Sequence, residues 1–204
     1  MKTINEYIKE AAEFHGRYTP HVALTVIMID YAVELIKKLN IREIGVRVES
    51  EKSCGCDQDV FYVMLKDIFG YCFLRRADFG KHSSFCLYNI KTGYGVRVFV
   101  SPEKCKKYPL FYTWFMKKIT DKRPTKEQVI DEILAAGREI LSYQNVKIKT
   151  EKEEKQNILI CEVCKEAFAS KGEKICKTCS GEADYEICDT VKKCSHKATK
   201  SQSI

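Results

Sequence analysis

The sequence contains no long apolar run. Its most apolar stretch, residues 22–36, is interrupted by Thr25, Asp30 and Glu34, and no segment reaches the roughly 18 consecutive apolar residues that suggest a membrane span. The N-terminus carries acidic residues and has no apolar segment ending in small residues, so it does not resemble a secretory signal. We therefore expect a cytoplasmic protein without a membrane span.

Proline and glycine are also scarce, with four and ten among 204 residues. Apolar residues make up 45% of the sequence and charged residues 31%, a balance typical of a globular protein. The length fits a core domain with a small appendage. We predict a core domain over residues 1–150, a small module over residues 156–185 and a flexible tail over residues 186–204, with the charged run at residues 151–155 as the boundary.

Apolar periodicity predicts the elements of an α+β core domain. Helical spacing is found at residues 4–15, 20–39, 57–69, 103–119 and 126–141, and strand-like patterns at residues 44–49, 71–77, 84–88, 95–100 and 146–149. The runs at residues 71–77, 84–88 and 95–100 follow one another closely, and we interpret them as a meander. The predicted fold is therefore a mainly antiparallel sheet packed against helices.

Cysteine, by contrast, is abundant, with 11 residues, an odd number that cannot pair completely within one chain. Without a secretory signal, this content indicates metal or redox chemistry rather than a disulfide framework. Cys188, Cys194 and His196 follow no recognisable ligand spacing, and we expect no site from them.

Four cysteines form two CxxC pairs separated by 11 residues: Cys161, Cys164, Cys176 and Cys179. Two such pairs can close tetrahedrally around one Zn²⁺ per chain, in a zinc ribbon or treble-clef module. Two disulfides, free thiols or a rubredoxin-like iron site are the alternatives. Four cysteine ligands leave no open coordination position, so the predicted site is structural.

A second candidate site involves His15, Cys54, Cys56 and Asp59. His15 ends the inward face of the first helix and the cysteines enter another helix, so the two helix ends can converge on a cleft. A helix N-terminus favours the thiolate of Cys56, and Asp59 could orient a histidine or bind metal. Two alternatives are a histidine that belongs to the core and a cysteine hydrolase that uses Cys56 and His15.

Several short motifs together resemble the FmdE family, which is associated with formylmethanofuran dehydrogenase. They are Phe14-His15-Gly16 followed by Pro20, Cys56-x-x-Asp59, Asp78-Phe79-Gly80-Lys81, Phe85-x-x-Tyr88-Asn89, Thr92-Gly93-x-Gly95-x-Arg97-Val98 and the cysteine pairs. The resemblance implies an α+β core, a C-terminal zinc finger and a homodimer. It also implies an accessory subunit, or a metal- or small-anion-binding protein, linked to the molybdenum or tungsten dehydrogenase of one-carbon metabolism. The chain has no pterin, flavin or iron–sulfur signature, so the resemblance does not make it an enzyme by itself.

The chain departs from the family pattern His-Gly-His-x-Cys-Pro at two presumed ligand positions, which hold Arg17 and Thr19. The cleft would then bind a second metal with a changed ligand set, or an anion through Arg17. The candidate cleft residues are His15, Arg17, Cys54, Cys56, Asp59 and Lys81.

Residues 103–123 carry seven basic and two acidic residues interleaved with aromatic ones, within a chain of net charge +7. This pattern can bind nucleic acid or a protein partner. The alternative is that the aromatic side chains belong to the core and the lysines are solvated.

Overall fold

The computed structural model describes residues 2–39, 43–50, 55–71, 73–118, 123–149, 157–183 and 185. The chain divides into two compact units, residues 1–150 and 151–204, which we call the core unit and the cysteine module. The charged run at residues 151–155 and the side chains of Cys54, Cys188, Cys194 and His196 lie outside the described residues. No helix in the described part of the chain is long and apolar enough to cross a membrane.

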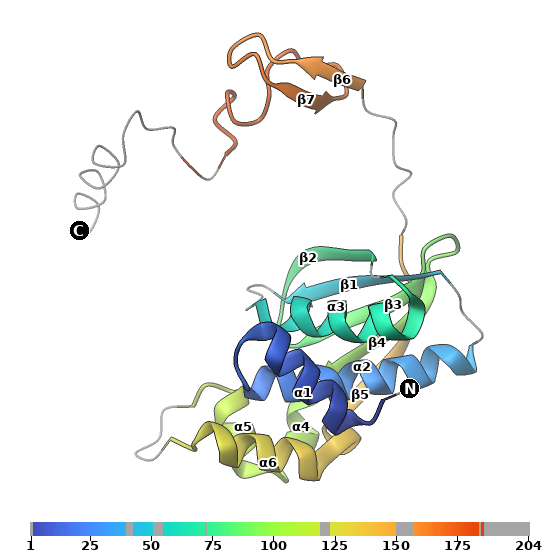
Figure 1. The fold of residues 1–204 in the computed structure, drawn as a ribbon, viewed down its shortest axis with the longest axis vertical. Helices are drawn as coiled ribbons and strands as arrows, with labels where there is room; N and C mark the ends of the chain where they lie inside the picture. The colour runs from blue at the N-terminus through green and yellow to red at the C-terminus, as the bar shows by residue number, and fades with distance from the viewer. Residues whose placement is uncertain are drawn as a thin grey trace, which may run out of the picture. The chain divides into compact units, whose positions relative to one another are not determined.

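The core unit is a mixed α+β structure (Figure 1). Its elements are α1 (Ile4–His15), α2 (Pro20–Lys38), β1 (Ile44–Ser50), α3 (Gly55–Phe69), β2 (Phe73–Lys81), β3 (Ser84–Asn89), β4 (Tyr94–Val100), α4 (Pro102–Cys105), α5 (Pro109–Phe115), α6 (Lys126–Ala136), the 3₁₀ turn η1 (Gly137–Ile140) and β5 (Leu141–Lys147). Two helices begin with a reciprocal capping box: Thr3 pairs with Glu6 at the start of α1, and Thr125 pairs with Gln128 at the start of α6. The segment Thr125-Lys126-Glu127-Gln128 has the sequence pattern of such a box, and the structure forms it.

The five strands of the core unit form one sheet in the order β2-β1-β3-β4-β5. Three of the four pairings are antiparallel, as predicted, but β2 pairs with β1 in parallel. The expected meander is therefore wrong for residues 73–81. Because α3 carries the chain back across the sheet between β1 and β2, the two strands run in the same direction, as in other βαβ crossovers.

Two predicted helices are shorter than expected. The segment 103–119 forms α4 and α5 instead of one helix, because Pro109 has no amide hydrogen and holds the preceding Tyr108 out of the helical region. Helix α6 ends at Ala136, where Gly137 has a positive φ of 52°, and β5 already begins at Leu141. Apolar periodicity over residues 126–141 would place Leu134 on the inward face of one continuous helix, but Leu134 is 37% exposed.

One face of the sheet packs on the helices and forms a continuous apolar core. Helix α2 is central to it, and nearly all of its side chains from residue 22 to residue 29 are fully buried. Phe61 of α3 meets Phe85 of β3 edge-to-face at 4.8 Å between ring centroids. This contact fixes α3 over the middle of the sheet.

The opposite face of the sheet buries a polar cluster around Glu49. The Glu49 carboxylate accepts hydrogen bonds from Arg97 Nε at 2.6 Å and from Ser84 Oγ at 2.8 Å. Cys86 lies beside it, and burial together with the Glu49 charge raises the pKa of its thiol to about 12. Cys86 is therefore a protonated, structural cysteine.

The cysteine module contains the antiparallel pair β6 (Asn157–Ile160) and β7 (Ala167–Ser170). The apolar side chains of β6 are exposed, and the buried residues of the described module are Cys161, Ser170 and Cys176. The described part of the module has no apolar core comparable to that of the core unit.

Candidate metal centres

The structure brings the four cysteines of the two CxxC pairs together. Cys161 and Cys164 lie in the turn that joins β6 to β7, and Cys176 and Cys179 lie in a second turn further along the chain. All four sulfur atoms lie within 4.8 Å of one another, and Cys164 Sγ is 3.7 Å from Cys176 Sγ. A tetrahedral zinc site with Zn–S bonds of about 2.3 Å separates its sulfurs by roughly 3.8 Å. The donor set and its spacing therefore fit Zn²⁺.

Backbone hydrogen bonds shape both turns of this site. The amide of Cys161 donates to Glu166 O at 2.9 Å, and the amide of Lys165, which has a positive φ of 63°, donates to Cys161 O at 3.0 Å. In the second turn, the amide of Cys176 donates to Cys161 Sγ at 3.4 Å and lowers the pKa of that thiol to about 6. The backbone thus favours the thiolate of Cys161, which is the form that binds metal, whereas burial and the adjacent thiols raise the pKa of Cys179 to about 12.

In the core unit, His15, Cys56 and Asp59 form a connected chain of side chains. His15 Nδ1 lies 2.8 Å from Asp59 Oδ2, and His15 Nε2 lies 3.1 Å from Cys56 Sγ. Cys56 is 6% exposed, and the His15 side chain is 10% exposed. The Asp59 carboxylate therefore orients the imidazole so that its other nitrogen points at the thiol.

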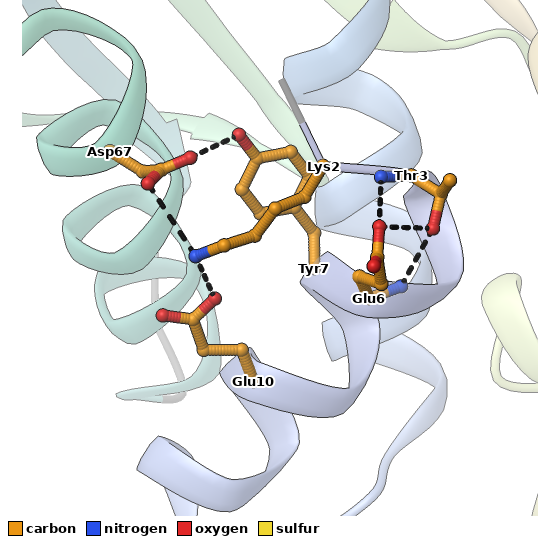
Figure 2. A network of polar contacts seen from close by, with 6 residues as sticks. All are labelled: Lys2, Thr3, Glu6, Tyr7, Glu10 and Asp67. Carbon is orange, nitrogen blue, oxygen red and sulfur yellow. Dashed lines mark hydrogen bonds and ion pairs between the residues drawn. The ribbon is translucent and has the colours of Figure 1, made fainter.

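Helices α1 and α3 hold this arrangement because they run antiparallel. His15 at the end of α1 meets the beginning of α3, while Tyr7 Oη near the beginning of α1 donates to Asp67 near the end of α3 at 2.6 Å. Lys2 adds ion pairs to Asp67 at 3.5 Å and to Glu10 at 2.6 Å. Figure 2 shows this polar network between the two helices. The two helices are thus tied at both ends.

Comparisons with known proteins agree with these two parts of the structure. The sequence model of the family described as FmdE, molybdenum formylmethanofuran dehydrogenase operon, matches residues 14–150. The chain belongs to the FmdE family. The model of the FmdE treble clef zinc finger matches residues 152–186, and with the four-cysteine cluster it supports a structural zinc.

A solved structure is similar to this FmdE protein over nearly its whole length. It is the crystal structure of a tungsten formylmethanofuran dehydrogenase FmdE-like protein from Syntrophus aciditrophicus, with a TM-score of 0.73 and 28% sequence identity. The match covers 91% of this chain and 96% of that chain. A comparison with curated proteins finds no match.

Thr19 lies next to the Cys56 thiol, an arrangement that sequence reasoning missed. Its side chain begins α2 by accepting a hydrogen bond from the Val22 amide, and its Oγ1 lies 3.8 Å from Cys56 Sγ. The sequence signal was the Thr-Pro pair, which is typical of a helix start. Position 19, one of the two presumed ligand positions of the FmdE pattern, therefore adjoins Cys56 in space.

Arg17 and Lys81 form no hydrogen bond or ion pair with these three residues in the described part of the chain, and Cys54 lies outside it. Arg17 is exposed and lines a cavity of about 630 Å³ against α1, whose lining includes Gly16 and Tyr18 but neither His15 nor Cys56. Lys81 is exposed at the end of β2. Of the six predicted residues, the structure brings together His15, Cys56 and Asp59, while the cavity lies beside them.

The aromatic side chains of residues 103–123 serve the core. Phe111 and Phe115 are buried, and three further rings pack partly against the core, those of Tyr108, Tyr112 and Trp114. Lys106, Lys107, Lys117 and Lys118 are exposed. In the described part of this segment, Trp114, Lys117 and Lys118 line a cavity.

Proposed function

We propose that this FmdE-family protein is an accessory protein whose core unit binds a metal ion through Cys56 and His15, and whose cysteine module is held together by zinc on Cys161, Cys164, Cys176 and Cys179. The observation that carries the proposal for the core unit is the Asp59–His15–Cys56 chain. The second ring N–H of a metal-binding histidine usually donates a hydrogen bond to a carboxylate, a backbone carbonyl or a water, which fixes the tautomer and the ring orientation. Asp59 occupies that position toward His15.

The geometry of Cys56 and His15 suits a shared metal ion. Ligand bonds of about 2.3 Å from sulfur and 2.0 Å from nitrogen place the two donor atoms roughly 3.5 Å apart in a tetrahedral site. Their observed separation of 3.1 Å needs only a small adjustment. Among the described residues, three or more ligand atoms gather only at the four module cysteines, so a metal here would keep open positions for water or a small anion.

Metal analysis tests this proposal directly. Protein purified without added metal and then loaded with Co²⁺ or Zn²⁺ is expected to hold two ions per chain. The His15→Ala variant should hold only the ion of the cysteine module. The Cys161→Ser, Cys164→Ser double variant should hold only the ion of the core unit. Asp59→Asn should weaken the core ion about tenfold to 100-fold, because it loses the carboxylate that orients His15.

Cys86→Ser is the matched control, because it removes a buried thiol of the core unit that lies beside Glu49 on the opposite face of the sheet. It should leave both ions bound. A single ion in the unaltered protein, or a second ion that survives His15→Ala, would contradict the core site.

A second candidate function is supported by the same three residues. A thiol beside an imidazole that is itself oriented by a carboxylate is the arrangement of an activated cysteine nucleophile. Iodoacetamide at pH 7 should then alkylate Cys56 in metal-free protein faster than Cys105, another buried thiol, and His15→Ala should slow the reaction. Equal rates at the two cysteines would remove this candidate.

We also propose that the protein works with dehydrogenase subunits of one-carbon metabolism and forms a homodimer. The description of the matching family and the name of the similar crystal structure support the dehydrogenase subunits as partners, and the homodimer rests on the family resemblance alone. Affinity purification from the host should recover molybdenum or tungsten dehydrogenase subunits, and light scattering should give twice the mass of the 204-residue chain. A monomer that recovers no such subunits would contradict both statements.

A further inference from the structure

A second cavity in the core unit is lined by positive charge and by the only tryptophan of the chain. Its volume is about 360 Å³, which lies in the range of small-molecule sites. The described residues that line it are Thr113, Trp114, Lys117, Lys118, Arg123 and Pro124. They come from α5 and the turn after it, and from the segment before α6.

The positive charge of this cavity is not neutralised by the carboxylates that the structure describes. None of these carboxylates lines it, and none forms an ion pair with Lys117, Lys118 or Arg123. Lys117 and Lys118 follow α5, where positive charge also stabilises the C-terminus of a helix. Arg123 comes from a different segment, before α6, and its charge adds to that of the two lysines. Three cations thus meet around one hollow without a counter-ion of the described chain.

Two neighbouring histidines respond to this charge. Burial is the main cause that lowers the pKa of His21, to about 4, and of His82, and the Lys117 charge lowers both further. The ring centroid of His82 lies 4.6 Å from that of Phe115, and the Phe115 backbone offsets part of the lowering of the His82 pKa. Both histidines are therefore neutral near pH 7 and leave the lysines and Arg123 as the charged groups.

The indole of Trp114 is held in place before any ligand binds. His21 meets it edge-on at 4.6 Å between ring centroids, and Phe111 packs against it at 6.0 Å. The turn after α5 is fixed by hydrogen bonds from the Lys117 and Lys118 amides to Trp114 O and Thr113 O. Lys117 adopts a positive φ of 51°, an unfavourable conformation for a residue with a side chain. The ring and the backbone of the two lysines are thus positioned by the fold.

We propose that this cavity binds a small organic phosphate that carries a planar ring, such as a nucleoside monophosphate. Lys117, Lys118 and Arg123 would hold the phosphate, and the ring would lie against Trp114. Guanidinium and ammonium groups form strong charge-assisted hydrogen bonds to phosphate oxygens, and bases stack on indole rings. The site is separate from Cys56 and His15, and it does not depend on the metal proposed there.

Trp114 gives the experiment its readout, because it is the only tryptophan and its fluorescence reports on this cavity. Titration with adenosine monophosphate should change the fluorescence saturably, and calorimetry should give the same affinity. Adenosine and inorganic phosphate should each bind at least about tenfold more weakly, because each lacks one half of the contacts. The Arg123→Gln and Lys118→Gln variants should each weaken binding about tenfold.

Lys107→Gln is the matched control, because it removes the same charge from an exposed lysine of the same segment outside the cavity. It should leave the affinity unchanged, and all variants should keep the far-ultraviolet circular dichroism and the metal content of the unaltered protein. No saturable response to adenosine monophosphate, or equal weakening by Lys107→Gln and Arg123→Gln, would overturn the proposal. Binding only to oligonucleotides, with an affinity that rises with their length, would overturn it in favour of a nucleic-acid surface.

Discussion

The core unit buries a continuous cluster of apolar side chains that extends from α1 to β5, whereas the described cysteine module buries Cys161, Ser170 and Cys176. A unit that buries so little surface cannot offset the conformational entropy of its chain without a further constraint. The two units therefore obtain their stability from different sources, apolar packing in one and metal–thiolate bonds in the other. Changes in one unit should leave the other intact.

The largest effect is expected from the double variant Cys161→Ser, Cys164→Ser. It should release the zinc and unfold the module, because structural zinc contributes on the order of 10 kcal/mol to the folding of such modules. Zinc content and the amide nuclear magnetic resonance signals of residues 157–183 measure this loss.

The core unit of this double variant should keep its melting temperature. The control is Cys105→Ala, which removes a fully buried core thiol and should retain the zinc. Zinc bound with undiminished affinity by the double variant would refute the assignment of these ligands.

The converse change is Phe61→Ala in the core unit. Phe61 is 1% exposed and packs on Phe85, so its truncation should lower the free energy of unfolding by about 3–5 kcal/mol. Denaturant unfolding followed by circular dichroism measures the loss, and the zinc content should not change. A loss of zinc in parallel with core stability would show that the two units are coupled.

Acid should destabilise the core unit through His21. Burial, and then the charges of His82 and Lys117, lower its pKa from 6.5 to about 4, so the unfolded chain binds the proton more tightly than the folded one. Stability is therefore fully present above pH 6.5 and is lost as the pH falls toward 4, by at most about 3 kcal/mol.

Thermal unfolding of the core unit at pH 7, 5.5 and 4.5 measures this loss. In His21→Phe, which keeps an aromatic ring against Trp114, the same decrease in pH should cost less stability. Equal pH dependence in the variant and the unaltered protein would assign the effect to other groups.

A smaller effect is expected at the polar contact between α1 and α3. Tyr7→Phe removes the hydrogen bond to Asp67 and should cost about 1 kcal/mol of core stability. Tyr62→Phe is the control, because the Tyr62 side chain is 46% exposed and should contribute almost nothing. A similar loss of stability in both variants would indicate that the hydrogen bond of the buried Tyr7 contributes no more to stability than the exposed hydroxyl of Tyr62.

Much of this structure follows from local sequence patterns. The amphipathic spacing of residues 4–15, the apolar run of α2 and the capping box at Thr125 each predict a helix that the structure contains. The two CxxC pairs likewise predict the sulfur cluster, because ligand spacing is itself a local property.

Features that depend on chain direction or on distant neighbours could not be predicted in this way. Alternation marks β2 as a strand, but it carries no information on whether the partner is β1 or β3. The contact of Thr19 with Cys56 joins residues 37 positions apart, and the hydrogen bond of Ser84 to Glu49 joins residues 35 apart. Such contacts arise only from the packing of whole elements.

The crowding of four thiols in the cysteine module also makes it, among the described cysteines, the place where oxidation can most easily form disulfides. Sulfurs within 4.8 Å of one another can form disulfides with small movements once no metal holds them as thiolates. In the core unit, the described neighbours of Cys56 Sγ include a nitrogen of His15 and an oxygen of Thr19, neither of which can cross-link to it. Oxidative stress should therefore affect the module first, with loss of zinc and formation of disulfides. Any oxidation of Cys56 should remain reversible by reduction.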